Sequence, residues 1–183
     1  DANNNSVSTN VVTTSAAQSS GIFIQSSNGT LVVNNTFKTT GSSLSFAVQL
    51  ETSASSTIYN NILNSTVNHV NVTTPFINNF SAARTGASVV NSIIGGKTIG
   101  GNFYDNSTVG GKQAWSLNCT DSNFDGLCDT PLSFATSNVD FFPLTKVFNQ
   151  PPADPTTLVP ASLTNYSTAT IGLTCSGSSD FEN

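Results

Sequence analysis

The feature that most constrains this chain is a repeated unit: a short apolar segment, a turn rich in Ser and Asn, and a pair of asparagines. The pairs fall at 34–35, 60–61 and 78–79, which are 26 and 18 residues apart, and Asn102 follows 23 residues later. Repeats of about 20–25 residues are typical of solenoids, in which each repeat forms one coil and equivalent side chains stack. We therefore expect a continuous apolar core and hydrogen-bonded ladders of turn asparagines.

The apolar segments are the predicted strands of this solenoid, and they span residues 21–25, 31–37, 46–50, 57–63, 70–72 and 75–80. Abundant Val, Ile and Thr and twelve Phe favour strands over disorder, although Ser, Thr and Asn dominate the composition. Residues 1–20 fit either a partial first coil or an ordered arm. The alternative fold is a β-sandwich, which requires alternating strands and tight antiparallel turns that the sequence does not clearly display.

Residues 92–146 contain three further patterns. Gly-Gly pairs at 95–96 and 100–101 suit sharp corners between very short strands, because glycine permits positive φ and close backbone approach. An Asp-rich run follows at 121–129, and Phe-Phe-Pro-Leu at 141–144 is interpreted as a plug over an apolar end. Trp115 is predicted to cover the same end of the core.

The Asp-rich run is the candidate metal site. It places side-chain oxygens on alternate residues around the Gly126 turn, which is how a short loop wraps a hard cation. Leu132 stands where an EF-hand loop has its bidentate Glu, so we expect a structural Ca²⁺ ion of moderate affinity, with an empty Asx-rich turn as the alternative. The predicted ligands are Asp121, Asn123, Asp125, the backbone carbonyl of Leu127, and Asp129.

The three patterns, in this order and spacing, resemble the C-terminal end of the NosD-type, or PbH1-repeat, right-handed parallel β-helix proteins, many of which are archaeal surface proteins. The matching segments are 93–105, 121–131 and 139–144, with Phe103-Tyr104 in place of the usual Tyr-Trp. The resemblance implies an all-β, right-handed parallel β-helix with a loop-rich C-terminal cap.

The copper handling for which that family is named is not expected here. Copper sites use clustered Cys, Met and His side chains, whereas this chain has no Met and only one His. We interpret that residue, His69, as a surface or ladder residue.

Charge and cysteines point to an exported protein. Charged residues are 8% of the chain and the net charge is −5, so no basic surface for nucleic acid is expected. No apolar run approaches the ~18 residues of a membrane span, and a chain starting at Asp1 is expected to be a mature or excised segment. We expect a Cys119–Cys128 disulfide and an oxidising compartment, with Cys175 left to pair elsewhere.

Nine N-x-S/T sequons are candidate glycosylation sites in an exported protein, although asparagines in turns and ladders would produce several by chance. They are Asn4, Asn28, Asn34, Asn64, Asn71, Asn79, Asn106, Asn118 and Asn165.

Three regions are predicted along the chain. Residues 1–147 form the β-helix segment with its cap, and 148–157 form a stiff Pro-rich linker. Residues 158–183 resemble the first two strands of an immunoglobulin-like or fibronectin-type module. Two strands cannot hold a core alone, so this strand pair would complete another sheet as an assembly arm.

The sequence favours a non-enzymatic function. Between residues 20 and 104 the charged residues are too few to pair carboxylates for glycoside chemistry, being Lys38, Glu51, Arg84 and Lys97. We expect a self-assembling extracellular or cell-surface protein, in a surface layer, filament or adhesion complex, with copies of itself, other surface proteins and glycans as partners. The alternatives are a carbohydrate-binding module with Trp115 and Tyr104 as stacking platforms, and a degenerate polysaccharide lyase.

Overall fold

The computed structural model describes residues 3–73, 76–83, 91–106, 114–135 and 137–146. The predicted linker and strand pair at 148–183 lie outside these residues, as do Cys175 and Asn165. The three-region organisation therefore stays a prediction.

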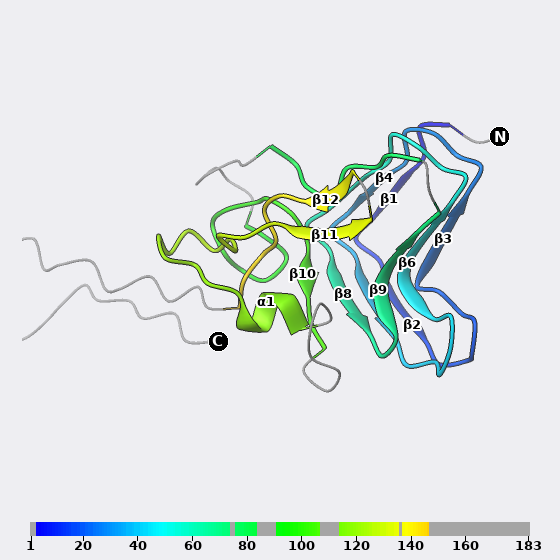
Figure 1. Ribbon diagram of the computed structural model, residues 1–183, viewed down its shortest axis with the longest axis horizontal. Coiled ribbons are helices and arrows are strands. Elements are labelled where there is room, and N and C mark those ends of the chain that lie inside the picture. Colours follow the sequence, from blue (N-terminus) through cyan, green and yellow to red (C-terminus); the bar gives the residue numbers. More distant parts are fainter. Residues whose placement is uncertain (1–2, 74–75, 84–90, 107–113, 136, 147–183) are drawn as a thin grey trace, which may run out of the picture. The chain divides into compact units, whose positions relative to one another are not determined.

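Three parallel sheets form a β-helix, one sheet along each side of the stacked coils (Figure 1). This confirms the predicted parallel β-helix. The first sheet contains β1 (Ser6–Ser8), β4 (Leu31–Val33) and β7 (Thr57–Tyr59). The second contains β2 (Val11–Thr14), β5 (Thr36–Thr39), β8 (Ile62–Ser65) and β10 (Phe103–Tyr104). The third contains β3 (Ile22–Gln25), β6 (Phe46–Glu51) and β9 (Asn68–Val72).

Each coil takes one strand from each sheet. Coil 1 is β1–β3, coil 2 is β4–β6 and coil 3 is β7–β9, so the first 20 residues contribute two strands of a coil rather than an arm. Paired residues of coils 1 and 2 are 25 or 26 positions apart, as in Val11 with Thr36 and Ile22 with Val48. The fourth coil is incomplete: Asn79 bridges to Thr57, and a long insertion then precedes β10.

The core is a stack of inward-facing side chains. Because successive residues of a strand point to opposite faces, one residue in two is buried, and equivalent positions of neighbouring coils lie over one another. Fully buried examples are Val32 with Ile58 in the first sheet and Phe37 with Leu63 in the second. This arrangement gives every interior coil the same kind of apolar neighbour above and below.

Left-handed residues bend the chain between the first and second sheets. The segments predicted as single strands at 31–37 and 57–63 are each two strands, broken at Asn34 (φ 59°) and Asn60 (φ 53°). Asparagine enters this region more readily than most residues, since its short polar side chain can hydrogen-bond locally. The Asn-Asn pairs therefore mark corners of the coil.

The asparagines form two separate ladders, whereas the sequence analysis placed all of them in one series of repeats. In the first ladder, each backbone N–H donates to the side-chain Oδ1 of the next rung: Asn10 to Asn35 at 2.9 Å, Asn35 to Asn61 at 2.9 Å, and Asn61 to Asn102 at 3.3 Å. Asn78 is absent from this ladder, so the predicted 18-residue step was wrong.

Asn78 belongs to a second ladder at the other end of the first sheet. The Ser56 N–H donates to Asn78 Oδ1 at 3.0 Å, and the Asn78 N–H donates to Asn138 Oδ1 at 2.9 Å. The two ladders therefore edge the first sheet on both sides.

A cap follows β10. It contains the short helix α1 (Trp115–Asn118) and an antiparallel hairpin of β11 (Leu132–Ala135) and β12 (Asn138–Asp140), which lie beside the last coils in Figure 1. Phe134 of β11 packs on Phe80 and Tyr104, with ring centroids 4.9 and 5.6 Å apart. In the described part of the chain, no helix is long and apolar enough to cross a membrane.

Candidate functional site

The first asparagine ladder ends at Asp140, which β12 places over Asn102. The Asn102 N–H donates to Asp140 Oδ2 at 2.8 Å, and the Tyr104 hydroxyl donates to the same oxygen at 2.8 Å. The Phe142 N–H donates to Asp140 Oδ1 at 3.1 Å. The Asn61 side chain accepts through Oδ1 and donates through Nδ2 to Asn102, and Asn102 in turn donates to Asp140, with which the ladder ends.

Burial sets the electrostatics of this end. Asp140 is completely buried, and the loss of hydration raises its pKa to about 7, although the hydrogen bonds from Asn102, Tyr104 and Phe142 act in the opposite direction. Burial, together with the nearby Asp140 carboxylate, also raises the pKa of Tyr104 well above its usual value. Gly101 is required here because a Cβ at this position would overlap the Asp140 carboxylate.

The predicted apolar plug is only partly correct. Leu144 is fully buried and packs with Phe103 and Leu127 in an apolar cluster beside the second sheet. Phe141, however, is 54% exposed, and the hairpin residue Phe134 takes the packing role instead. Trp115 is half-buried against the core, in the position predicted for it.

Two further aromatic interpretations were wrong. Tyr104 is fully buried and bonded to Asp140, so it offers no stacking platform to a ligand. His69 is buried rather than at the surface, with its ring 5.7 Å from that of Tyr104. Tyr104 of β10 is paired with the buried Leu63 of β8. His69 lies on β9, whose pairing with β6 begins irregularly, so strand alternation does not reveal that it is buried.

The Asp-rich loop binds its own backbone. The Asp125 N–H donates to Asp121 Oδ1 at 3.1 Å and the Gly126 N–H donates to Asp121 Oδ2 at 2.9 Å. The Leu127 N–H donates to Asp125 Oδ1 at 2.9 Å, and Asn123 Oδ1 accepts from the Asp125 N–H at 3.3 Å. The carboxylates thus complete Asx-type turns, which is the alternative that the sequence left open.

The end of the loop is held in the same way. Asp129 Oδ2 accepts from both the N–H and the hydroxyl of Ser122, at 3.0 and 2.7 Å, and these bonds lower the pKa of Asp129. Cys119 and Cys128 are joined by a disulfide. The loop is therefore closed by a covalent bond and by its own hydrogen bonds.

The asparagines of the sequons differ in how accessible they are to glycosylation. Asn106 is buried and its Nδ2 donates to the Ser65 carbonyl, and Asn118 Nδ2 donates to the Ala114 carbonyl, so both amides are engaged. The half-buried candidates are Asn34, Asn64 and Asn71, and the exposed ones are Asn4, Asn28, Asn79 and Asn118.

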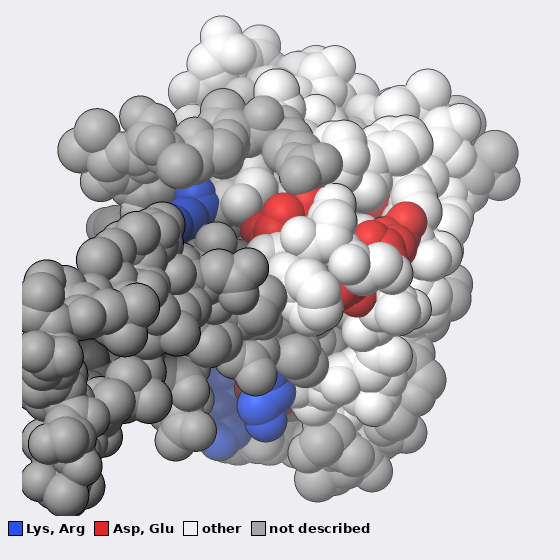
Figure 2. Space-filling model, turned by 90° about the vertical axis from the view of Figure 1, so that its left-hand side faces the viewer, with Lys and Arg blue, Asp and Glu red and all other residues white. Residues whose placement is uncertain are grey.

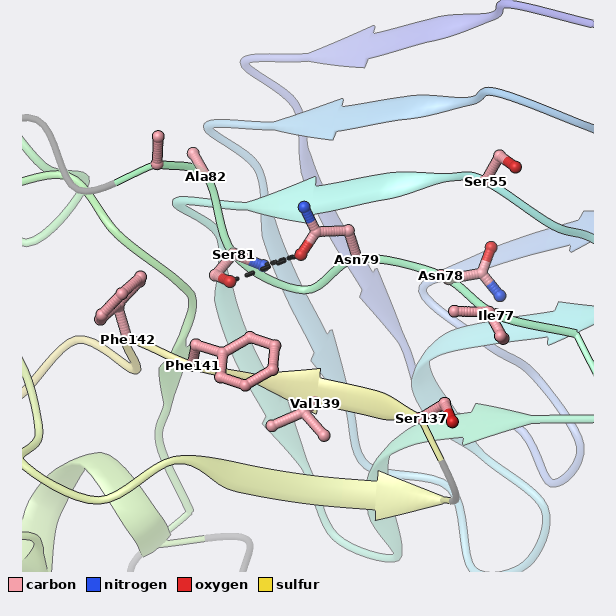
Figure 3. A pocket seen from close by; sticks show the side chains of 11 residues that line it. Ser55, Ile77, Asn78, Asn79, Ser81, Ala82, Ser137, Val139, Phe141 and Phe142 are labelled. Atoms are coloured by element: carbon pink, nitrogen blue, oxygen red, sulfur yellow. Dashed lines mark hydrogen bonds between the residues drawn. The ribbon is translucent and has the colours of Figure 1, made fainter.

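A groove of about 600 Å³ runs along the outer side of the cap hairpin (Figure 3). One wall is the fourth rung of the first sheet, including Ile77 and Asn79, and the other is the β12 side, including Val139 and Phe141. In Figure 3 the Phe141 ring lies on the β12 side and faces the segment that carries Asn79 and Ser81. The described residues that line it are uncharged: Ser55, Ile77, Asn78, Asn79, Ser81, Ala82, Ala83, Ser137, Val139, Phe141 and Phe142.

Comparison with known proteins places the chain in a family. A family model described as periplasmic copper-binding protein (NosD) matches residues 1–109. Neither a curated protein nor a solved structure matches the chain.

The predicted calcium site is wrong. The matching family is described as copper-binding, and the described residues contain no group of three or more His, Cys, Asp or Glu side chains that could hold a metal ion. Figure 2 shows acidic side chains only as small separate patches among the described atoms of the capped end. The sequence pattern supplied oxygen atoms, but the loop amides already occupy them.

The same residues do not offer the ligands that copper favours. Copper favours thiolate, thioether and imidazole ligands. The chain has no Met, His69 is buried against Tyr104, and Cys119 and Cys128 are joined to each other. The described residues therefore do not fit a copper ion.

Proposed function

Because this chain belongs to the family described as periplasmic copper-binding protein (NosD), we propose that it is an exported structural β-helix that associates with copies of itself through coil 1. The family description and the disulfide both support an oxidising compartment outside the cytoplasm. The observation that carries the proposal is the difference between the two ends of the β-helix.

Coil 1 leaves core positions open. Val7 and Val12 are only half-buried, whereas their coil 2 partners Val32 and Phe37 are fully buried. Asn10 is exposed although Asn35, the next rung of its ladder, is buried. Among the described residues, no layer covers coil 1 in the way that coil 1 covers coil 2. We propose that a second copy supplies such a layer, because apolar burial favours its addition.

The strand edges of coil 1 carry no protection against pairing. Natural edge strands are commonly blocked by charged side chains, Pro or bulges. Residues 3–37 contain no charged side chain and no Pro, and Val11 at the edge of the second sheet is 80% exposed. Two copies of this uncharged surface can approach without electrostatic repulsion.

The opposite end does not offer the same contact. The hairpin β11–β12 packs over the last rung, and Asp140 ends the ladder with its oxygens engaged. We therefore propose contact between two coil 1 ends, which closes a dimer. A surface layer or filament needs a second contact, and the predicted strand pair at 158–183 is our candidate for it.

Sedimentation velocity of the full chain over a range of concentrations tests the proposal. We expect a reversible dimer that Val11→Lys disrupts, because a Lys on an edge strand opposes pairing. Leu44→Lys is the matched control, since it places the same charge on a 58% exposed apolar residue of a loop outside coil 1. A monodisperse wild-type monomer, or equal effects of both substitutions, would refute assembly through coil 1.

We also propose that the protein is non-enzymatic and glycosylated. The uncharged lining of the groove, which has no carboxylate pair or imidazole, supports the first point. Release of unsaturated products from polygalacturonate or alginate would contradict it and support the lyase alternative. The exposed sequons support the second point, which mass spectrometry of the native protein checks at Asn4 and Asn28.

A further inference from the structure

The groove beside the cap borders β12, which connects the two asparagine ladders. Between the two ladders, coil 3 uses five residue steps, from Ser56 to Asn61, whereas the cap goes from Asn138 to Asp140 in two. β12 therefore connects the same two ladders by a shorter path than a coil takes. Its outer side is bordered by the groove.

Apolar side chains are unusually exposed in this groove. Ile77 is 59% exposed and Phe141 is 54% exposed, and they stand on opposite walls. Large apolar side chains gathered around a concave surface and accompanied by a few polar groups are typical of ligand sites. The polar groups here are hydroxyls and amides, from Ser55, Asn79 and Ser137.

The chemistry of the lining selects a class of ligand. None of the described residues that line the groove is charged, so these residues have nothing to compensate an ionic ligand for the loss of water. An aromatic ring beside amides and hydroxyls suits a molecule that has both an apolar face and many hydroxyl groups. We propose that the groove binds a neutral saccharide, one ring of which packs its C–H face against Phe141.

The saccharide has two conceivable sources, and Asn79 distinguishes them. Asn79 lines the groove, is exposed, and is the acceptor residue of an N-x-S sequon. Its Oδ1 accepts from the N–H and the hydroxyl of Ser81, at 3.2 and 3.4 Å (Figure 3). The sugar in the groove is therefore either a glycan attached to Asn79 or one supplied by another molecule.

Binding to the full chain made in a host without N-glycosylation tests the external source. The probes are chitotetraose and maltohexaose, with polygalacturonate as the anionic comparison, measured by titration calorimetry. We expect a neutral probe to bind and Phe141→Ala to weaken it about tenfold. Phe124→Ala is the matched control because Phe124 is 46% exposed but lies in the Asp-rich loop, outside the groove.

Mass spectrometry of the native protein tests the attached source. A glycan on Asn79 that resists glycosidase in wild-type protein and becomes sensitive in Phe141→Ala would support the proposal with the glycan as occupant. Failure of both neutral probes together with an unmodified Asn79 would overturn it. So would a probe that binds the wild type and Phe141→Ala equally, or a preference for polygalacturonate. None of these outcomes depends on self-association through coil 1.

Discussion

Replacing Asp140 with Asn tests whether burial or hydrogen bonding controls the capped end of the β-helix. Three residues, Asn102, Tyr104 and Phe142, donate to this carboxylate and favour its charged form, whereas complete burial disfavours it. Burial prevails, since the pKa rises from 3.8 to about 7. At about 1.4 kcal/mol per pKa unit, this rise of about 3 units corresponds to about 4 kcal/mol.

The sign of the effect follows from proton binding. Between about pH 4 and pH 7 the folded protein keeps a proton on Asp140 that the unfolded chain has lost. The contribution of Asp140 to the free energy of unfolding is therefore largest below about pH 4, falls as the pH rises to about 7, and is constant above that. A carboxylate with a lowered pKa would give the opposite trend.

The asparagine variant removes this titration but keeps the shape of the side chain. Its Nδ2 would meet the Phe142 N–H that now donates to Oδ1, at a pH-independent cost of about 1–3 kcal/mol. The informative quantity is therefore the difference in unfolding free energy between wild type and Asp140→Asn as a function of pH. We expect this difference to fall by about 4 kcal/mol between about pH 4 and pH 8.

Urea unfolding followed by the fluorescence of Trp115, the single Trp of the chain, measures this difference with the disulfide intact. Similar urea dependences in both proteins would validate the comparison. A difference that does not change with pH would refute the reasoning. One that increases with pH would mean that the three donors outweigh burial.

Three other predictions use the same or simpler measurements. Asn35→Ala should lower the unfolding free energy by about 2–4 kcal/mol, because it leaves buried ladder groups unpaired. Asn64→Ala is the control: its side chain points outward on β8, so the unfolding free energy should change by at most about 0.5 kcal/mol. Equal effects of the two substitutions in urea unfolding would count against the ladder. Gly101→Ala should cost about 1–3 kcal/mol because its Cβ would overlap the Asp140 carboxylate, and wild-type stability would show that the cap tolerates the methyl group. Calcium and its chelator should both leave the melting temperature unchanged, and a rise on adding calcium would restore a metal role for the Asp-rich loop.

The parallel β-helix could be predicted because stacked coils of a solenoid make the same contacts, which require a repeated sequence pattern. Each coil touches only its neighbours, so apolar residues and asparagines recur wherever the coils stack. The exact register could not be predicted, because loops of different length leave the coils. Asn78 and Asn102 look alike in sequence, yet they stand in different ladders.

The candidate site was harder to predict, since its residues depend on partners that are distant in the chain. Phe141 is exposed directly after β12, and Tyr104 is buried because it pairs with the core residue Leu63, neither of which a local pattern encodes. The groove was missed for the same reason. The only sequence signal for it was the aromatic pair at 141–142, which suggested a plug instead.

The sequence by itself determined that this chain stacks short strands, turns at asparagines and ends in a distinct closing segment, because these properties depend on residue type and spacing. Only the tertiary structure decided what the acidic residues do. Asp140 of the cap strand β12 is buried, which raises its pKa, whereas Asp121 and Asp125 accept hydrogen bonds from the amides of their own loop. The role of a carboxylate is set by the water and donors around it, and the fold determines both.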